Sequence, residues 1–120
     1  MQPDLRDSGY LWDMLESARQ VLQFTAGSSF EKYSGNRMLQ LAVERAIQII
    51  GEAANRVSLD YRAAHPEIPW RRIIAQRNVL VHEYADIEDR LVWDLIQDHL
   101  PELVRQLETL VPPPPVEPGG

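Results

Sequence analysis

The sequence predicts an all-α fold, an up-and-down bundle of four to five helices. Apolar residues recur at steps of three and four through most of residues 8–110, which is the period of amphipathic helices. No alternating run rich in Val, Ile or Thr stands between hairpin turns, so the sequence offers no candidate strand. A length of 120 residues with 44% hydrophobic content fits one domain with a single core.

The first helix is predicted over residues 8–25. Gly27 follows and ends it, because glycine is the usual residue just past a helix C-terminus. Ser28 with Glu31 three residues later fits a capping box, which predicts a short helical turn before Gly35. The stripe of this first helix consists of Leu11, Met14, Leu15, Ala18, Val21, Leu22 and Thr25.

A second helix is predicted from Asn36, its N-cap, to about Val57. Its apolar arc is wide, which is typical of a central helix packed on more than one side. The segment HPEIP at residues 65–69 follows as a rigid connector, because proline restricts the residue before it to extended conformations. The apolar positions of the helix are Leu39, Leu41, Val43, Ala46, Ile47, Ile49, Ile50, Ala53 and Val57.

Two further helices complete the bundle. The third is predicted over residues 70–83, with Pro69 near its first turn. The fourth begins with Asp86 as N-cap and Asp89 in its first turn, and we expect Pro101 to bend or break it. The PPPPVEPGG segment at residues 112–120 cannot bury apolar surface, so we expect a helical domain at residues 1–111 and a disordered tail.

The composition excludes several classes of function. The chain has no cysteine, so disulfides, thiolate metal sites and thiol nucleophiles are excluded. Its net charge of −6 argues against a broad, non-specific duplex-DNA surface, and eleven of the twelve basic residues are arginine, which suits forked recognition of phosphate or carboxylate. The three histidines are far apart in sequence, so we expect no metal site. No signal peptide or membrane span is evident, which favours a cytoplasmic protein.

The third helix breaks its own pattern at Arg77. At about 100° per residue, this arginine falls within the apolar arc that also contains Trp70, Ile73 and Tyr84. A buried guanidinium without a partner is costly, so Arg77 must meet a carboxylate, an interface or a solvent-filled cleft. An internal ion pair with Glu52 or Glu44 is the simplest structural explanation.

A polar flank lies beside that arc. Asn78 and His82 are four residues apart and share one face of the helix, with Arg71 above them. Arg77 and His82 are five residues apart, about 140° around the axis, so they meet poorly within one helix. A two-fold dimer would bring each Arg77 near the partner copy's equivalent of His82 and form a shared cleft.

Residues 77–84 spell R-N-x-x-x-H-x-Y, which resembles the signature of HEPN-superfamily ribonucleases, specifically the HepT-type toxins. The similarity extends to IIGEAANRVS at 49–58, PEIPWRRI at 66–73 and the HLPEL around Pro101, in the same order and spacing. It covers nearly all of residues 5–111. One departure is Gln48, where many relatives carry glutamate.

The resemblance implies a homodimeric, HEPN-like helical bundle that acts as a metal-independent endoribonuclease on RNA, with tRNA as the expected target and no cofactor. Carried over residue by residue, Arg77 and His82 form the catalytic pair, with Asn78, Arg71 and Glu52 in support. Tyr84 corresponds to the tyrosine that a MntA-like nucleotidyltransferase antitoxin adenylylates to silence the toxin. The expected product carries a 2′,3′-cyclic phosphate.

A non-enzymatic reading stays open beside this one: a HEPN-type helical adaptor that binds a nucleotidyltransferase without activity of its own. The presence of Arg77, His82 and Tyr84 together favours the enzyme, because an adaptor has no need to hold an arginine within its apolar stripe. The chemistry fits as well, since RNA carries its own nucleophile in the 2′-hydroxyl. Catalysis then needs only a group that manages a proton and a cation that stabilises the pentacoordinate phosphate, which imidazole and guanidinium supply.

Overall fold

The computed structural model describes residues 2–81 and 85–111. Within residues 77–88 it describes at most the backbone, not the side chains. The described residues form seven helices and no strand, which confirms the predicted all-α class. Five longer helices build the bundle, and two short ones extend the predicted count of four to five. Their bounds are α1 Leu5–Thr25, α2 Phe30–Ser34, α3 Arg37–Arg56, α4 Leu59–Ala64, α5 Trp70–Val81, α6 Ala85–Asp98 and α7 Leu100–Leu110.

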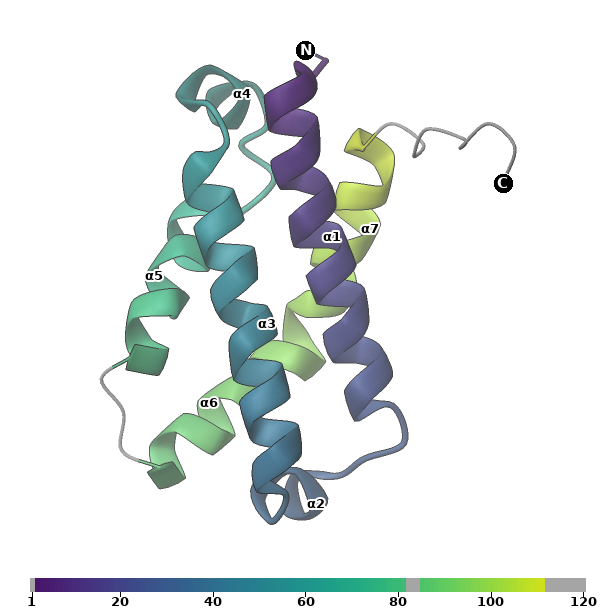
Figure 1. The fold of residues 1–120 in the computed structure, drawn as a ribbon, viewed down its shortest axis with the longest axis vertical. Helices are drawn as coiled ribbons and strands as arrows, with labels where there is room; N and C mark the ends of the chain where they lie inside the picture. The colour runs from purple at the N-terminus through teal and green to yellow at the C-terminus, as the bar shows by residue number, and fades with distance from the viewer. Residues whose placement is uncertain (1, 82–84, 112–120) are drawn as a thin grey trace.

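The helix α3 is the centre of the bundle (Figure 1). It packs against α1 on one side and α5 on the other, while α7 runs along α1 and the short α2 joins α3 to α6. The prediction that this helix, with its wide apolar arc, is central to the bundle is therefore confirmed. Leu41 is the exception, because its side chain is half exposed.

Helix ends follow capping chemistry. Asn36 caps α3 as predicted, accepting a hydrogen bond from the backbone N–H of Leu39 at 3.0 Å. The α1 helix begins at Leu5, before the predicted start at residue 8, because the Asp4 side chain accepts from the N–H of Asp7 at 2.7 Å. Gly27 has a φ of 73° and follows α1, as expected for a left-handed residue beyond a helix end.

Two predicted caps were wrong. Ser29, not Ser28, caps α2 by accepting from the N–H of Lys32 at 3.2 Å. The α6 helix begins at Ala85, which places Asp86 inside its first turn rather than at the N-cap. Pro101 does produce the predicted break: α6 ends at Asp98 and α7 starts at Leu100, where proline's missing N–H costs no helical hydrogen bond.

The structure also contains α4, which the periodicity did not predict. Ser58 caps this six-residue helix by accepting from the N–H of Tyr61 at 3.2 Å. The same serine binds Asp7 near the start of α1, donating its N–H at 2.9 Å and its hydroxyl at 2.7 Å. Tyr61 is fully buried and packs against Trp70 at the start of α5, so α4 fixes where α5 begins.

Candidate functional site

The helix α5 contains the first five positions, 77–81, of the motif that the sequence singled out. Trp70 and Ile73 are buried against the core, and the Trp70 indole N–H donates to the backbone carbonyl of His65 at 2.9 Å. This bond and Pro69 set the start of the helix after the predicted rigid connector. The helix continues to Val81, so its backbone spans positions 77 and 78 in the predicted register.

The predicted site residues are only partly within the described structure. Positions 77 and 78 lie on α5, but the side chains of Arg77 and Asn78 are outside the description. His82 and Tyr84 lie outside the described residues altogether. The predicted tail at 112–120 is also outside them. The pairing of Arg77 with His82 therefore stays a prediction.

The structure describes the side chains of two predicted supporting residues, Arg71 and Glu52. Arg71 is exposed on the first turn of α5, on the helix face that position 78 continues. Glu52 is half buried on α3, and one of its carboxylate oxygens lies 4.0 Å from the Arg45 guanidinium on the same helix. Glu44, the other carboxylate predicted as a partner for Arg77, has no ion pair among the described residues. Glu52 thus already has a cation beside it, although the weak, exposed pair leaves it able to exchange partners.

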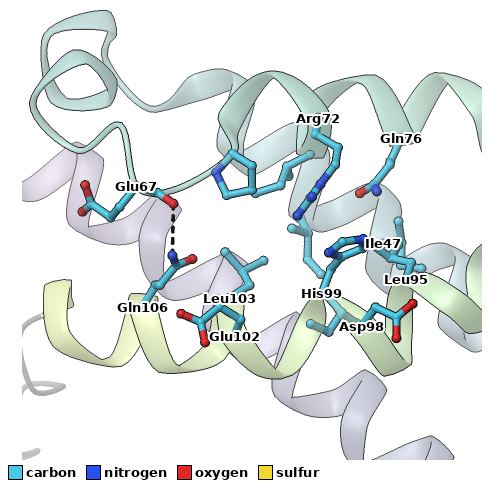
Figure 2. Close-up of a pocket in the computed structure, with 14 residues that line it drawn as sticks. Ile47, Glu67, Arg72, Gln76, Leu95, Asp98, His99, Glu102, Leu103 and Gln106 are labelled. Atoms are coloured by element: carbon cyan, nitrogen blue, oxygen red, sulfur yellow. Dashed lines mark hydrogen bonds between the residues drawn. The ribbon is translucent and has the colours of Figure 1, made fainter.

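A pocket of about 300 Å³ lies on the other side of α5, between that helix and the α6–α7 junction (Figure 2). Its floor is apolar, with Ile47 of α3, Leu95 of α6 and Leu103 of α7. The residues at the helix break before Pro101, Asp98, His99 and Leu100, line this space. Figure 2 shows the side chains of Arg72 and His99 extending toward each other across it.

The rim of this pocket is acidic overall. Three acidic residues line it, Glu67, Asp98 and Glu102, against the guanidinium of Arg72, although Figure 2 shows the carboxylate of Glu67 pointing away from the pocket. The pKa of Glu67 is lowered, chiefly by a backbone hydrogen bond to its carboxylate and also by His65, 3.1 Å away. The rim carboxylates therefore make the pocket a poor site for a phosphate group.

A second depression lies between α5, α4 and the end of α3, and it is shallow and open. Its charged lining residues are all arginines: Arg62, Arg71 and Arg72. Arg62 is held in place by bonds from its guanidinium to the carbonyls of Val57 and Asn55, both at 2.9 Å. Sequence reasoning identified Arg71 but missed the other two. For Arg72, the Arg-Arg pair directly after Trp70 was the available signal, because cations are disfavoured in a helix's first turn.

No metal centre is apparent in the part of the chain that is described. Within it, no three His, Asp or Glu side chains converge closely enough to hold an ion. None of the described helices is long and apolar enough to cross a membrane.

Comparison with known proteins shows which family this chain belongs to. Residues 14–110 match the family model described as "Ribonuclease HepT-like". Among curated proteins, the chain is 35% identical to "Putative RNase MJ1380" of Methanocaldococcus jannaschii, over 82% of this chain and 91% of that protein. It is 36% identical to "Probable ribonuclease HepT" of Thermococcus cleftensis, over 84% and 92% respectively. No solved structure gave a significant match.

Proposed function

Because this chain belongs to the HepT-like ribonuclease family, we propose that it is the toxin of a type VII toxin–antitoxin system and a metal-independent endoribonuclease. The observation that carries the proposal is the R-N-x-x-x-H-x-Y motif, which lies inside the 14–110 segment that matches the family. Its first five positions lie on the last turns of α5. We propose tRNA in the cytoplasm as its substrate.

The reaction needs no group beyond the chain and the RNA. The 2′-oxygen attacks the adjacent phosphorus, a P–O2′ bond forms, and the P–O5′ bond breaks to leave a 2′,3′-cyclic phosphate and a 5′-hydroxyl. His82 manages the proton lost by the 2′-hydroxyl and gained by O5′. The Arg77 guanidinium stabilises the extra negative charge on the phosphate, and Asn78 orients either the imidazole or the phosphate. Glu52 holds Arg77, and Arg71 adds positive charge.

A homodimer completes this site, since Arg77 and His82 do not meet well within one helix. Exposed apolar side chains support such an interface. Met38 and Leu41, in the first half of α3, are 79% and 51% exposed, and Leu91 of α6 is 51% exposed. These helix segments lie at the same end of the bundle as the C-terminal end of α5 (Figure 1).

Regulation is proposed at Tyr84. A MntA-like nucleotidyltransferase transfers AMP to the tyrosine oxygen from a nucleoside triphosphate, with pyrophosphate leaving. The added bulk and negative charge beside the motif would exclude an RNA phosphate.

The test is incubation of the mass-verified, unmodified protein with a tRNA pool in excess EDTA, next to His82→Ala. Cleavage that ends in a cyclic phosphate and is lost in the variant supports the ribonuclease. Intact RNA with both proteins contradicts it and favours the adaptor that binds a nucleotidyltransferase.

A further inference from the structure

The open depression beside α5 differs from the pocket in Figure 2 by its charge. We call it the arginine groove, after Arg62, Arg71 and Arg72, which line it without any carboxylate. The pocket on the other side of α5 is lined by three acidic residues, Glu67, Asp98 and Glu102. Arg72 lines both depressions, and Figure 2 shows its guanidinium extending toward His99 in the pocket, whereas Arg62 and Arg71 line the groove alone. In a chain with a net charge of −6, this local excess of guanidinium groups attracts anions.

Two of these arginines have no partner in the described part of the chain. Arg71 and Arg72 are exposed, and neither makes an ion pair or side-chain hydrogen bond there. Both occupy the first turn of α5, which contains no acidic residue. The positive end of the helix dipole disfavours cations at that position, and no acidic side chain of the described residues pairs with either arginine to offset this cost. A bound anion would offset it.

The groove also continues toward the motif. At about 100° per residue, position 78 lies within about 20° of Arg71 around α5, and Ala75 lies between them on the same face. Seven residues correspond to about 10 Å along the helix axis. An anionic chain lying in the groove would therefore pass onto the motif-bearing turns of α5. Ala75 is exposed and short, so the path along this face is open.

We propose that the arginine groove binds the sugar–phosphate backbone of a single-stranded RNA segment on one side of the cleavage site. This inference rests on the proposed ribonuclease function and assigns Arg62, Arg71 and Arg72 to substrate positioning. Guanidinium groups pair with phosphate through forked hydrogen bonds and also stack on unpaired bases. A second copy of this chain is a poor occupant, because a two-fold contact would place equal arginine clusters together.

The experiment measures RNA binding without turnover. Fluorescence anisotropy with a labelled single-stranded RNA gives the Kd of protein carrying His82→Ala, at several salt concentrations. Arg71→Gln and Arg72→Gln are added together in one variant. The matched control adds Arg19→Gln and Arg105→Gln, which remove the same charge from exposed arginines paired with Glu108 and Glu102. Circular dichroism confirms that each variant remains helical.

We expect the groove variant to bind at least tenfold more weakly in about 0.1 M salt, with the slope of log K against log salt reduced by about 1.4 for two phosphate contacts. The control should change Kd less than twofold. Equal affinity and slope in the groove and control variants would overturn the proposal, as would loss of the dimer in the groove variant alone. Either result leaves the ribonuclease assignment standing if the parent still cleaves RNA and His82→Ala does not.

Discussion

The carboxylate of Asp7 accepts two hydrogen bonds from Ser58, one from the backbone N–H at 2.9 Å and one from the hydroxyl at 2.7 Å. The two residues are 51 positions apart in sequence. Asp7 is 4% exposed, so its negative charge depends on these donors. The contact joins the first turn of α1 to the N-cap of α4, and α4 in turn packs Tyr61 against the start of α5.

Replacing this carboxylate should therefore weaken the whole fold. We expect Asp7→Ala to lower the free energy of unfolding by about 1–3 kcal/mol, because two charge-assisted hydrogen bonds are lost and the Ser58 donors lose their acceptor. Urea unfolding monitored by circular dichroism measures the change. Asp13→Ala, at an exposed position of the same helix, is the control and should stay within about 0.5 kcal/mol. Equal stabilities of the two variants would contradict this role.

Tyr61 should give the protein an alkaline stability limit. Its pKa is raised above the usual value, chiefly by burial and further by the charges of Glu67 and Asp7. The folded state therefore holds the phenol proton more tightly than the unfolded state. This contribution is fully present below the unfolded pKa of about 10 and is lost as pH rises through the folded value.

The measurement is the free energy of unfolding of Tyr61→Phe and the parent between pH 8 and pH 11, about one unit past that unfolded value. We expect the variant to flatten part of the alkaline loss. Near pH 7 it should lie within about 1 kcal/mol of the parent, because the buried hydroxyl has no hydrogen-bond partner among the described residues. Tyr10→Phe, at a half-buried position, should leave the alkaline loss in place. A Tyr61→Phe profile parallel to that of the parent would refute the assignment.

The exposed apolar side chains at one end of the bundle should mediate dimerisation. Met38→Glu with Leu41→Glu places charge in that surface, so we expect a monomer with unchanged helicity and loss of RNA cleavage. Sedimentation velocity measures the assembly state. Leu5→Glu, which alters a 94% exposed leucine in the first turn of α1, should remain dimeric. A monomeric parent, or a dimer that survives the double substitution, would rule out this interface.

The two proposed catalytic groups should differ in how they tolerate substitution. We expect His82→Ala to reduce the single-turnover cleavage rate by about 10²–10⁴, the usual contribution of a general acid–base residue. Arg77→Lys keeps the charge but loses the forked geometry, so it should retain more activity than Arg77→Ala. His99→Ala is the matched histidine control, since His99 lies in the acidic-rimmed pocket. Full activity in His82→Ala would disprove the mechanism.

Short-range chemistry in the sequence predicted much of the fold. Asn36 as N-cap, Gly27 after α1 and the break at Pro101 each depend on a few neighbouring residues, so the pattern alone was sufficient. The six-residue α4 escaped prediction because it is too short to show a helical period. Its stability comes from the Ser58 cap and from burial of Tyr61.

The candidate site likewise has one part that the sequence predicted and one part that only the tertiary structure revealed. The sequence by itself determined the family motif at residues 77–84, because those residues lie within eight positions of one another and their spelling is readable without a fold. Only the tertiary structure decided that Arg62 of α4 joins Arg71 and Arg72 in one groove. It also decided that Asp7, 51 positions before Ser58 in the sequence, supports the N-cap of α4. The physical reason is distance in sequence: periodicity and capping act over one or two turns, whereas these contacts depend on how helices pack.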